Sequence, residues 1–282
     1  MSTYNPINQH SFQLTQAWTI VGLFIATTIA VSIPAAILNF VAKELSIDSP
    51  QLNAWITVFT NIICYVFLFF IINQIFGKST IAKPLFEDRH IDWTVYILIL
   101  LATLSLAVVL EPLSTLLLKL LPMPAWFEEI FNQSFTPSVT TFVLAVIIAP
   151  LCEEVLMRGV ILRGLLTSMP PKKAIIWSSF FFALIHFNPW QALPAFIIGL
   201  VLGWMYWKTR SIWPCIFIHF VNNLFAFIGI TIAGSRGLGA DTTLESLTGG
   251  YFTSIFVVAT VLLIVSFGLL QKRYKLKKGN IP

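Results

Sequence analysis

The segment APLCEEVLMRG, from Ala149 to Gly159, places two adjacent acids and an arginine directly after the apolar run TTFVLAVII. Ionisable side chains at membrane depth are costly, so they point to function and each one requires a partner. Glu154 and Arg158 are four residues apart, which puts them on one helix face and predicts an ion pair. Glu153 lies about 100° round the helix from Glu154 and needs a different partner.

An inert ion pair that only fixes helix packing is the alternative interpretation of these charges. It accounts for Glu154 and Arg158, but it leaves Glu153 unexplained, because a carboxylate that faces hydrocarbon costs free energy and makes no compensating contact. We therefore expect Glu153 to have a chemical function.

Two histidines lie in other apolar runs. His186 ends SSFFFALIH, where a lone histidine near an interface is more often structural than catalytic. His219 lies in CIFIHFVNN, with Asn222 and Asn223 three and four residues further on, so either amide can share its face. The alternative for this second set is a polar contact that holds helices together.

We assign no catalytic role to Glu111 or to the pair Glu128 and Glu129. Glu111 precedes Pro112, which predicts an interfacial acid at a helix break. The pair lies in PMPAWFEEIFNQSF, whose mixture of aromatic and acidic residues predicts an interfacial helix on the outer side.

A carboxylate, two imidazoles and an amide on three separate spans are the groups that general-base hydrolysis uses. If they converge in one water-filled cavity, the carboxylate and an imidazole take a proton from water. The second imidazole and the amide then donate to the developing oxyanion.

The composition predicts which type of secondary structure positions these groups. The chain has 282 residues, of which 57% are hydrophobic and 10% charged, and its mean hydropathy is +0.85. Soluble domains carry about 25% charged residues, so a soluble fold is excluded. We expect an all-α, polytopic helix bundle that forms a single membrane domain over residues 1–282, in contact with the lipid bilayer.

About twenty apolar residues cross a bilayer as a helix. Eight spans are predicted: Ala17 to Val41, Ala54 to Ile75, Trp93 to Leu110 (or to Leu121), Val139 to Leu166, Ala174 to Phe187, Leu193 to Trp207, Ile212 to Ile232 and Phe252 to Leu270. The fifth and sixth are short and joined by a tight NPWQ loop, so a hairpin that does not fully cross is the alternative. Gly199 and Gly203 in the sixth span predict a close helix contact.

The distribution of cations predicts the orientation, because cytoplasmic loops carry an excess of Lys and Arg. With both termini cytoplasmic, three cations fall outside: Lys43, Lys119 and Arg236. Thirteen fall inside: Lys78, Lys83, Arg89, Arg163, Lys172, Lys173, Lys208, Arg210, Lys272, Arg273, Lys275, Lys277 and Lys278. The net charge of +5 therefore reflects topology and does not indicate a nucleic-acid partner. Cys64, Cys152 and Cys215 fit no metal or disulfide framework and are expected to be small buried hydrophobes.

Three blocks in this order resemble the CPBP family of intramembrane proteases, which includes the CAAX-type prenyl endopeptidases and the abortive-infection-like proteins. The E-E-x-x-x-R block is EEVLMR (Glu153 to Arg158), F-x-x-x-H is FALIH (Phe182 to His186), and H-x-x-x-N/D is HFVNN (His219 to Asn223). The resemblance covers about Val139 to Phe227, and residues 139–227 are the expected catalytic core.

The resemblance implies an eight-helix fold with a site inside the membrane that opens toward the cytoplasm. It implies that Glu153 and His186 activate water, that His219 and Asn223 stabilise the oxyanion, and that Glu154, Arg158 and Phe182 support the site. The implied activity is that of an intramembrane endopeptidase. The implied substrate is a membrane-associated peptide, prenylated or bacteriocin-like, and the sequence fixes neither the substrate nor the oligomeric state.

Metal dependence is open at this stage. Zn²⁺ commonly takes three protein ligands in catalytic sites, and Glu153, His186 and His219 would supply them. No H-E-x-x-H motif is present, and an amide in the set suits a metal-free mechanism. We expect metal-free chemistry without a cofactor, with Zn²⁺ as the alternative.

Two other classes of function remain alternatives. In a proton-coupled transporter, Glu153 and the histidines would form a relay, but the internal repeats common in transporters are not visible. A catalytically idle immunity or scaffold protein would not need every motif residue.

Overall fold

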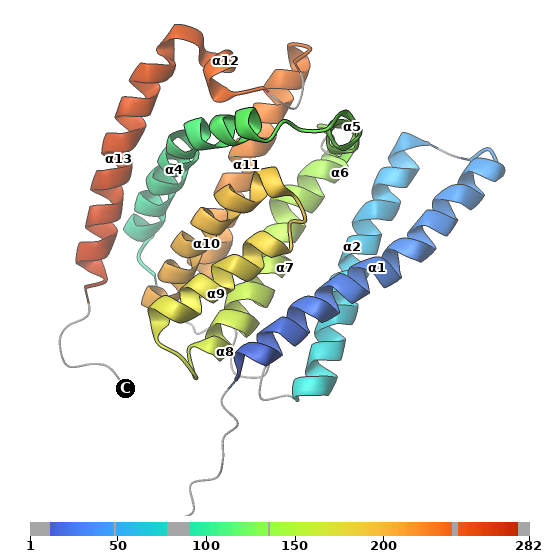
Figure 1. Cartoon of the computed structure of the whole chain (residues 1–282), viewed down its shortest axis with the longest axis horizontal. Helices are drawn as coiled ribbons and strands as arrows, with labels where there is room; N and C mark the ends of the chain where they lie inside the picture. Colours follow the sequence, from blue (N-terminus) through green and yellow to red (C-terminus); the bar gives the residue numbers. More distant parts are fainter. Residues whose placement is uncertain (1–11, 48, 78–90, 135, 239–241, 276–282) are drawn as a thin grey trace, which may run out of the picture.

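The computed structural model describes residues 12–47, 49–77, 91–134, 136–238 and 242–275. Every regular element within these ranges is a helix, and Figure 1 shows the helices arranged in one bundle. The prediction of an all-α bundle is therefore confirmed. The predicted cytoplasmic cations Lys78, Lys83, Arg89, Lys277 and Lys278 lie outside the described residues.

Seven helical segments of the described chain are long and apolar enough to cross a membrane. They match the first four and the last three predicted spans. The segments are α1 (Leu14–Glu44), α2 (Pro50–Phe76), α4 (Trp93–Leu120), the composite helix from α6 to α8 (Val139–Leu165), α10 (Pro189–Thr209), α11 (Trp213–Ser235) and α13 (Phe252–Arg273).

The predicted fifth span is α9 (Pro171–Leu184), and it is short, as expected. Its 14 residues extend about 21 Å, less than the ~30 Å hydrocarbon core. The sixth span was predicted too short, because α10 begins at Pro189 and has 21 residues. The Asn188 side chain accepts hydrogen bonds from the backbone N–H groups of Trp190 and Gln191, at 3.0 and 3.4 Å. NPWQ is therefore a capped helix start and not a loop.

The predicted helix break at Glu111 is wrong. Helix α4 continues through Pro112 to Leu120, and Glu111 lies inside it. Its Oε1 atom accepts hydrogen bonds from the Leu244 N–H at 2.9 Å and from the Thr115 hydroxyl at 3.2 Å. Glu111 therefore joins α4 to α12 (Leu244–Thr248). The predicted outer helix is present as α5 (Ala125–Ser134), and its interfacial position stays a prediction.

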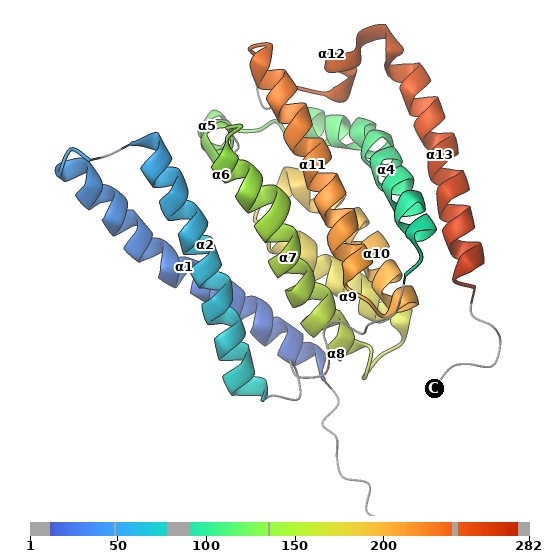
Figure 2. The ribbon, with the colours of Figure 1, turned by 180° about the vertical axis from the view of Figure 1, so that it is seen from behind.

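The arrangement of the helices has two distinct parts. Helices α1 and α2 form a hairpin. It diverges from the other helices at the end where α1 connects to α2, and the two described chain ends lie at the opposite end of the structure (Figures 1 and 2). In the main bundle α9 and α10 cover one face, while the composite helix and α11 lie on the other. At the far edge from the hairpin α13 packs along α4.

An exposed ion pair joins the ends of α4 and α13. Asp92 caps α4 by accepting from the Thr94 N–H at 3.0 Å, and it pairs with Arg273 Nη2 at 2.7 Å. The Thr94 N–H, and after it the Arg273 guanidinium, hold the pKa of Asp92 below its ordinary value.

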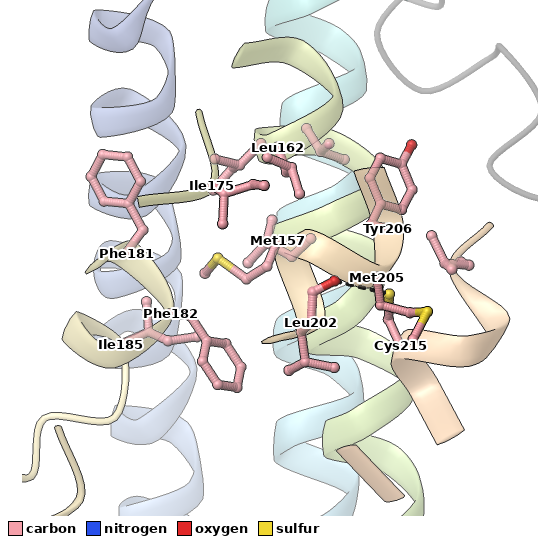
Figure 3. Close-up of a cluster of buried hydrophobic side chains, with 14 of the residues drawn as sticks. Met157, Leu162, Ile175, Phe181, Phe182, Ile185, Leu202, Met205, Tyr206 and Cys215 are labelled. Carbon is pink, nitrogen blue, oxygen red and sulfur yellow. Dashed lines mark hydrogen bonds between the residues drawn. The ribbon is translucent and has the colours of Figure 1, made fainter. Parts of the chain in front are cut away.

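The close contact predicted for Gly199 and Gly203 is confirmed, and it lies between α10 and α9. A Cβ atom at Gly199 would come within 3.0 Å of Ser179 Cα, and one at Gly203 within 2.9 Å of Ile175 Cγ2. Apolar side chains from η2 (Val155–Leu162), α9, α10 and α11 fill the centre around this contact (Figure 3). Cys215 is buried there as a small packing residue and donates to the Leu202 carbonyl at 3.3 Å.

Candidate active site

The helix that carries Glu153 and Glu154 leaves the α-helical hydrogen-bond register twice and returns to it each time. It runs from α6 (Val139–Thr141) through the π-helical η1 (Phe142–Ile148), α7 (Ala149–Glu154), the π-helical η2 (Val155–Leu162) and α8 (Arg163–Leu165). The two acids end α7, directly between the two π-helical stretches. Such stretches are rare and occur frequently at functional sites.

Pro150 explains why this helix needs the side chain of Asn223. In the register of η1 each N–H bonds the carbonyl five residues earlier, as Ala149 does to Leu144. Pro150 would be the next donor, but it has no N–H, so the Ala145 carbonyl loses its backbone partner. The Asn223 Nδ2 group donates to that carbonyl at 2.8 Å and replaces the missing bond.

The second hydrogen of the same amide nitrogen is not used by this contact. Asn222 Nδ2 donates to Asn223 Oδ1 at 3.1 Å, which fixes the orientation of the Asn223 amide. Asn223 therefore has a structural role that the motif alone did not reveal, and it keeps one donor for chemistry.

The predicted ion pair is present and fully buried. Arg158 Nη1 lies 3.0 Å from Glu154 Oε1, and neither side chain is exposed. Arg158 Nη2 donates to the Gly199 carbonyl of α10 at 3.1 Å. A buried charge is tolerated only when it is paired and hydrogen-bonded, so this contact requires the close approach of α10.

His219 extends the ion pair to a third helix. Its Nδ1 atom lies 2.9 Å from the same Glu154 oxygen that binds Arg158, and its side chain is 4% exposed. A carboxylate accepts this bond, so Nδ1 carries the proton. Nε2 is the nitrogen left for the reaction: it donates when the ring is doubly protonated and accepts when it is neutral.

His186 is fixed by the end of α9. Its Nδ1 atom lies 2.7 Å from the Phe182 carbonyl oxygen, one of the last carbonyls of the helix, which have no partner within it. A carbonyl only accepts, so Nδ1 carries the proton and a neutral ring presents its lone pair at Nε2. This tautomer suits a general base.

The ring of Phe182 separates the two imidazoles and the guanidinium. It meets His186 edge-on with ring centroids 4.9 Å apart, and His219 edge-on at 5.4 Å. The Arg158 guanidinium carbon lies 4.7 Å from the ring centroid on its face. Phe182 thus contacts both histidine rings and the arginine guanidinium with its single aromatic ring.

Glu153 has a different neighbour, Tyr65 of α2. The Tyr65 side chain lies near the Glu153 carboxylate, and its own exposure is only 7%. The Glu153 Oε2 atom is buried and has no hydrogen-bond partner among the described residues. Sequence reasoning missed Tyr65, because nothing in IICYVFLFF separates it from the surrounding apolar residues.

The structure brings five of the predicted site residues into direct contact: Glu154, Arg158, Phe182, His186 and His219. Glu153 and Asn223 lie on the same helices as these residues, but Glu153 lies near Tyr65 and Asn223 donates to the Ala145 carbonyl. No hydrogen bond or ion pair of the described chain joins Glu153 to either histidine. The carboxylate bound to His219 is Glu154, which the sequence did not predict.

The described residues contain no preformed ligand set for the alternative of a zinc site. Among the residues that the structure describes, no three His, Cys, Asp or Glu side chains are grouped so that they could hold a metal ion. Glu153, His186 and His219 therefore do not fit a zinc site in this conformation.

A cavity of about 780 Å³ lies between the start of α2 and the segment from Thr136 to Ala145. Its lining reaches Ala145, the residue held by Asn223, and it includes neither Glu153 nor the two histidines. The expected water-filled cavity around the catalytic set stays a prediction.

Comparison with known proteins agrees with the three motifs. Residues 134–225 match the model of the family described as type II CAAX prenyl endopeptidase Rce1-like. The match contains every motif residue, so the resemblance expected from the sequence is confirmed. The matched family is a protease family, and with the apolar helices it supports an integral, multi-pass membrane protein.

The chain is also similar to the UPF0177 protein YxdF from Lactococcus lactis subsp. lactis (strain IL1403). The two are 29% identical over 161 residues, which cover 56% of this chain and 87% of the relative. No solved structure matches the chain.

The two adjacent acids should differ in their effect on stability. Glu154→Gln leaves the buried Arg158 charge without its anion, and we expect a loss of about 3–5 kcal/mol. Glu153→Gln removes no ion pair and should change stability little. Thermal unfolding of the detergent-solubilised proteins measures both, and equal effects would contradict the assignment of Glu154 as the anion of the pair.

Asn223 and Pro150 should be coupled. Asn223→Leu leaves the Ala145 carbonyl without a donor, at a cost of about 1–3 kcal/mol. Pro150→Ala restores a backbone N–H, so the same Asn223 substitution should cost less in that background. Unfolding midpoints of the parent, both single variants and the double variant measure the coupling, and additive effects would refute it.

Proposed function

We propose that this protein is an intramembrane endopeptidase in which Glu153 and His186 activate water. The observation that carries the proposal is the difference between the two acids within a segment that matches a protease family: Glu154 Oε1 binds Arg158 and His219, whereas no ion pair of the described residues holds Glu153. The Oε2 atoms of both acids are buried without a hydrogen-bond partner among the described residues, and buried polar atoms of native proteins almost always have one. An attacking water can supply a partner to Glu153, whose carboxylate is not fixed by a charged group.

The reaction uses the groups as follows. Glu153, assisted by the free Nε2 of His186, takes a proton while the water oxygen attacks the peptide carbonyl carbon. The oxyanion that forms accepts from Nε2–H of the doubly protonated His219 ring and from the unused Asn223 N–H. The C–N bond then breaks, and the proton held by Glu153 passes to the leaving amine.

Glu154 and Arg158 act through His219. Glu154 fixes the Nδ1 side of the ring, so Nε2 keeps one direction, and Arg158 compensates the charge of Glu154. Phe182 limits the movement of both rings. Preorganised donors of this kind contribute roughly 10²–10³-fold to rate.

The substrate class follows from where these groups lie. The site residues lie on helices suited to a bilayer, so a hydrophobic or lipidated peptide reaches them more readily than a soluble one. The family description adds prenylated CAAX peptides as the first class to test. We further propose that both termini face the cytoplasm, which places Arg163, Lys172 and Lys208 on the inner side.

Cleavage should require Glu153, His186 and His219. A fluorescence-quenched peptide that ends in a farnesylated cysteine and three further residues, presented in liposomes, serves as the probe. Alanine at any of the three positions should abolish cleavage, whereas Glu245→Ala, at an exposed acid of α12, should retain it. Cleavage by Glu153→Ala at the parent rate would refute the mechanism, and equal cleavage of the unlipidated peptide would refute the lipid preference.

Catalysis should not require a bound metal. Because Glu153, His186 and His219 do not form a metal-ligand group here, treatment with a strong zinc chelator is expected to leave the cleavage rate unchanged. Elemental analysis of the active, purified protein gives a second readout. Loss of activity on chelation, with recovery on zinc addition, would show that the helices rearrange to bind the ion.

A further inference from the structure

An apolar cavity of about 270 Å³ lies between α13 and the helices α4, α10 and α11. All four helices contribute to its lining, which includes none of the proposed catalytic residues, and Thr103 carries the single hydroxyl group among the lining residues. A polar ligand would lose its hydrogen bonds with water here and regain few of them. The enclosed part of any ligand for this cavity is therefore apolar.

The cavity is closed toward the bundle and open on the side of α13. Met205 and Leu270 line it and are 1% and 2% exposed, whereas Ile264 also lines it and is 68% exposed. Trp204 of α10 meets Phe267 of α13 at the cavity wall, with ring centroids 4.9 Å apart. The exposed face of a helix that crosses a bilayer is in contact with acyl chains, so lipid has access to the opening.

The depth of the cavity matches the acyl chains of one leaflet. Helix α13 ends at Arg273, and its lining residues run from Leu263 to Leu270. At about 1.5 Å per residue, they lie roughly 5–15 Å from the end of the helix. The hydrocarbon of one leaflet is about 15 Å thick, half of the ~30 Å core. A lipid whose chain fills the cavity therefore has its headgroup near the end of α13.

A cation lies where that headgroup would be. Lys208 comes four residues after Trp204, so both lie on one face of α10. Its Nζ atom lies 4.1 Å from the centroid of the Trp207 ring, and no ion pair among the described residues neutralises it. Arg273 lies at the same end of the bundle, where it is paired with Asp92 (Figure 1). Lys208 is therefore the cation available to a phosphate group.

We propose that this cavity binds one acyl chain of an anionic glycerophospholipid, whose phosphate is held by Lys208. In the proposed orientation this end of the bundle faces the cytoplasmic leaflet, where anionic lipids attract basic residues. The bound chain contacts α10, α11 and α13 at once, so the lipid supports the packing of α13 against the bundle. This site is separate from the catalytic residues and does not depend on the proposed peptidase function.

The test is native mass spectrometry of the full chain, delipidated in a mild nonionic detergent and titrated with phosphatidylglycerol or with phosphatidylcholine of the same acyl chains. The parent should carry one phosphatidylglycerol per chain and bind it roughly fivefold more tightly than phosphatidylcholine, because one lysine near the surface gives a preference of this size for an anionic lipid. The unfolding midpoint should also rise with phosphatidylglycerol concentration. Equal binding of the two lipids would overturn the inference.

Two matched pairs of variants locate the site. Ile264→Trp obstructs the opening and should remove the adduct, whereas Val265→Trp, at the next exposed position of α13 and outside the lining, should keep it. Lys208→Gln should weaken phosphatidylglycerol binding roughly fivefold. Lys172→Gln removes the same charge at the start of α9 and should leave the affinity unchanged. Equal effects within either pair would contradict the assignment.

Other occupants and a failure of the proposed function give different results. A second copy of the chain in the cavity would appear as a dimer that phosphatidylglycerol does not dissociate, and it would exclude the lipid. Cleavage of the farnesylated peptide by Glu153→Ala at the parent rate would refute the peptidase mechanism while the phosphatidylglycerol adduct persists. The two proposals can therefore fail separately.

Discussion

The rest of the structure depends on one buried ion pair, Glu154 with Arg158. Two charges without exposure are stable only if further hydrogen bonds support them. Here the Gly199 carbonyl accepts from Arg158 and the His219 ring binds Glu154, and the two partners come from different helices. The arginine thus accounts for the approach of α10, which is close enough to need glycine, and the glutamate accounts for the histidine of α11.

Catalytic geometry follows from the same constraint. Glu154 binds Arg158 and His219 through one oxygen, so its position is fixed by two charged or polar partners. The two acids point in different directions from one helix, and no ion pair of the described residues holds Glu153. Two adjacent residues of the same type therefore have different surroundings, and in the proposed mechanism the less constrained one is the base.

The sequence predicted those features that local spacing or composition determines. The helical spans follow from hydropathy, and the Glu154–Arg158 pair follows from four-residue spacing on a helix. The order of the motifs located the candidate site. The cap at Asn188 was readable in principle, but Asn-Pro also favours turns, and the turn interpretation shortened α10.

Other features depend on contacts between distant segments or on backbone register. The proximity of Tyr65 to Glu153 depends on the relative rotation of two helices, which no sequence pattern states. The pairing of His219 with Glu154 has the same origin. The π-helical stretches keep an apolar surface much like that of an α-helix, so hydropathy does not distinguish them, and the link from Pro150 through Ala145 to Asn223 becomes visible only in three dimensions.

The partners of the Glu154–Arg158 pair also bear on how the protein is made. The Gly199 carbonyl lies 41 residues after Arg158 in the chain, and His219 lies 65 residues after Glu154. The helix that carries Glu154 and Arg158 is synthesised before α10 and α11, which carry its partners. Until those helices are inserted, it either stays at the insertion machinery or enters the lipid with incomplete hydrogen bonding. The bonds of this helix are therefore complete only after its second-half partners have been made, and a chain truncated before α11 lacks the histidine that binds Glu154.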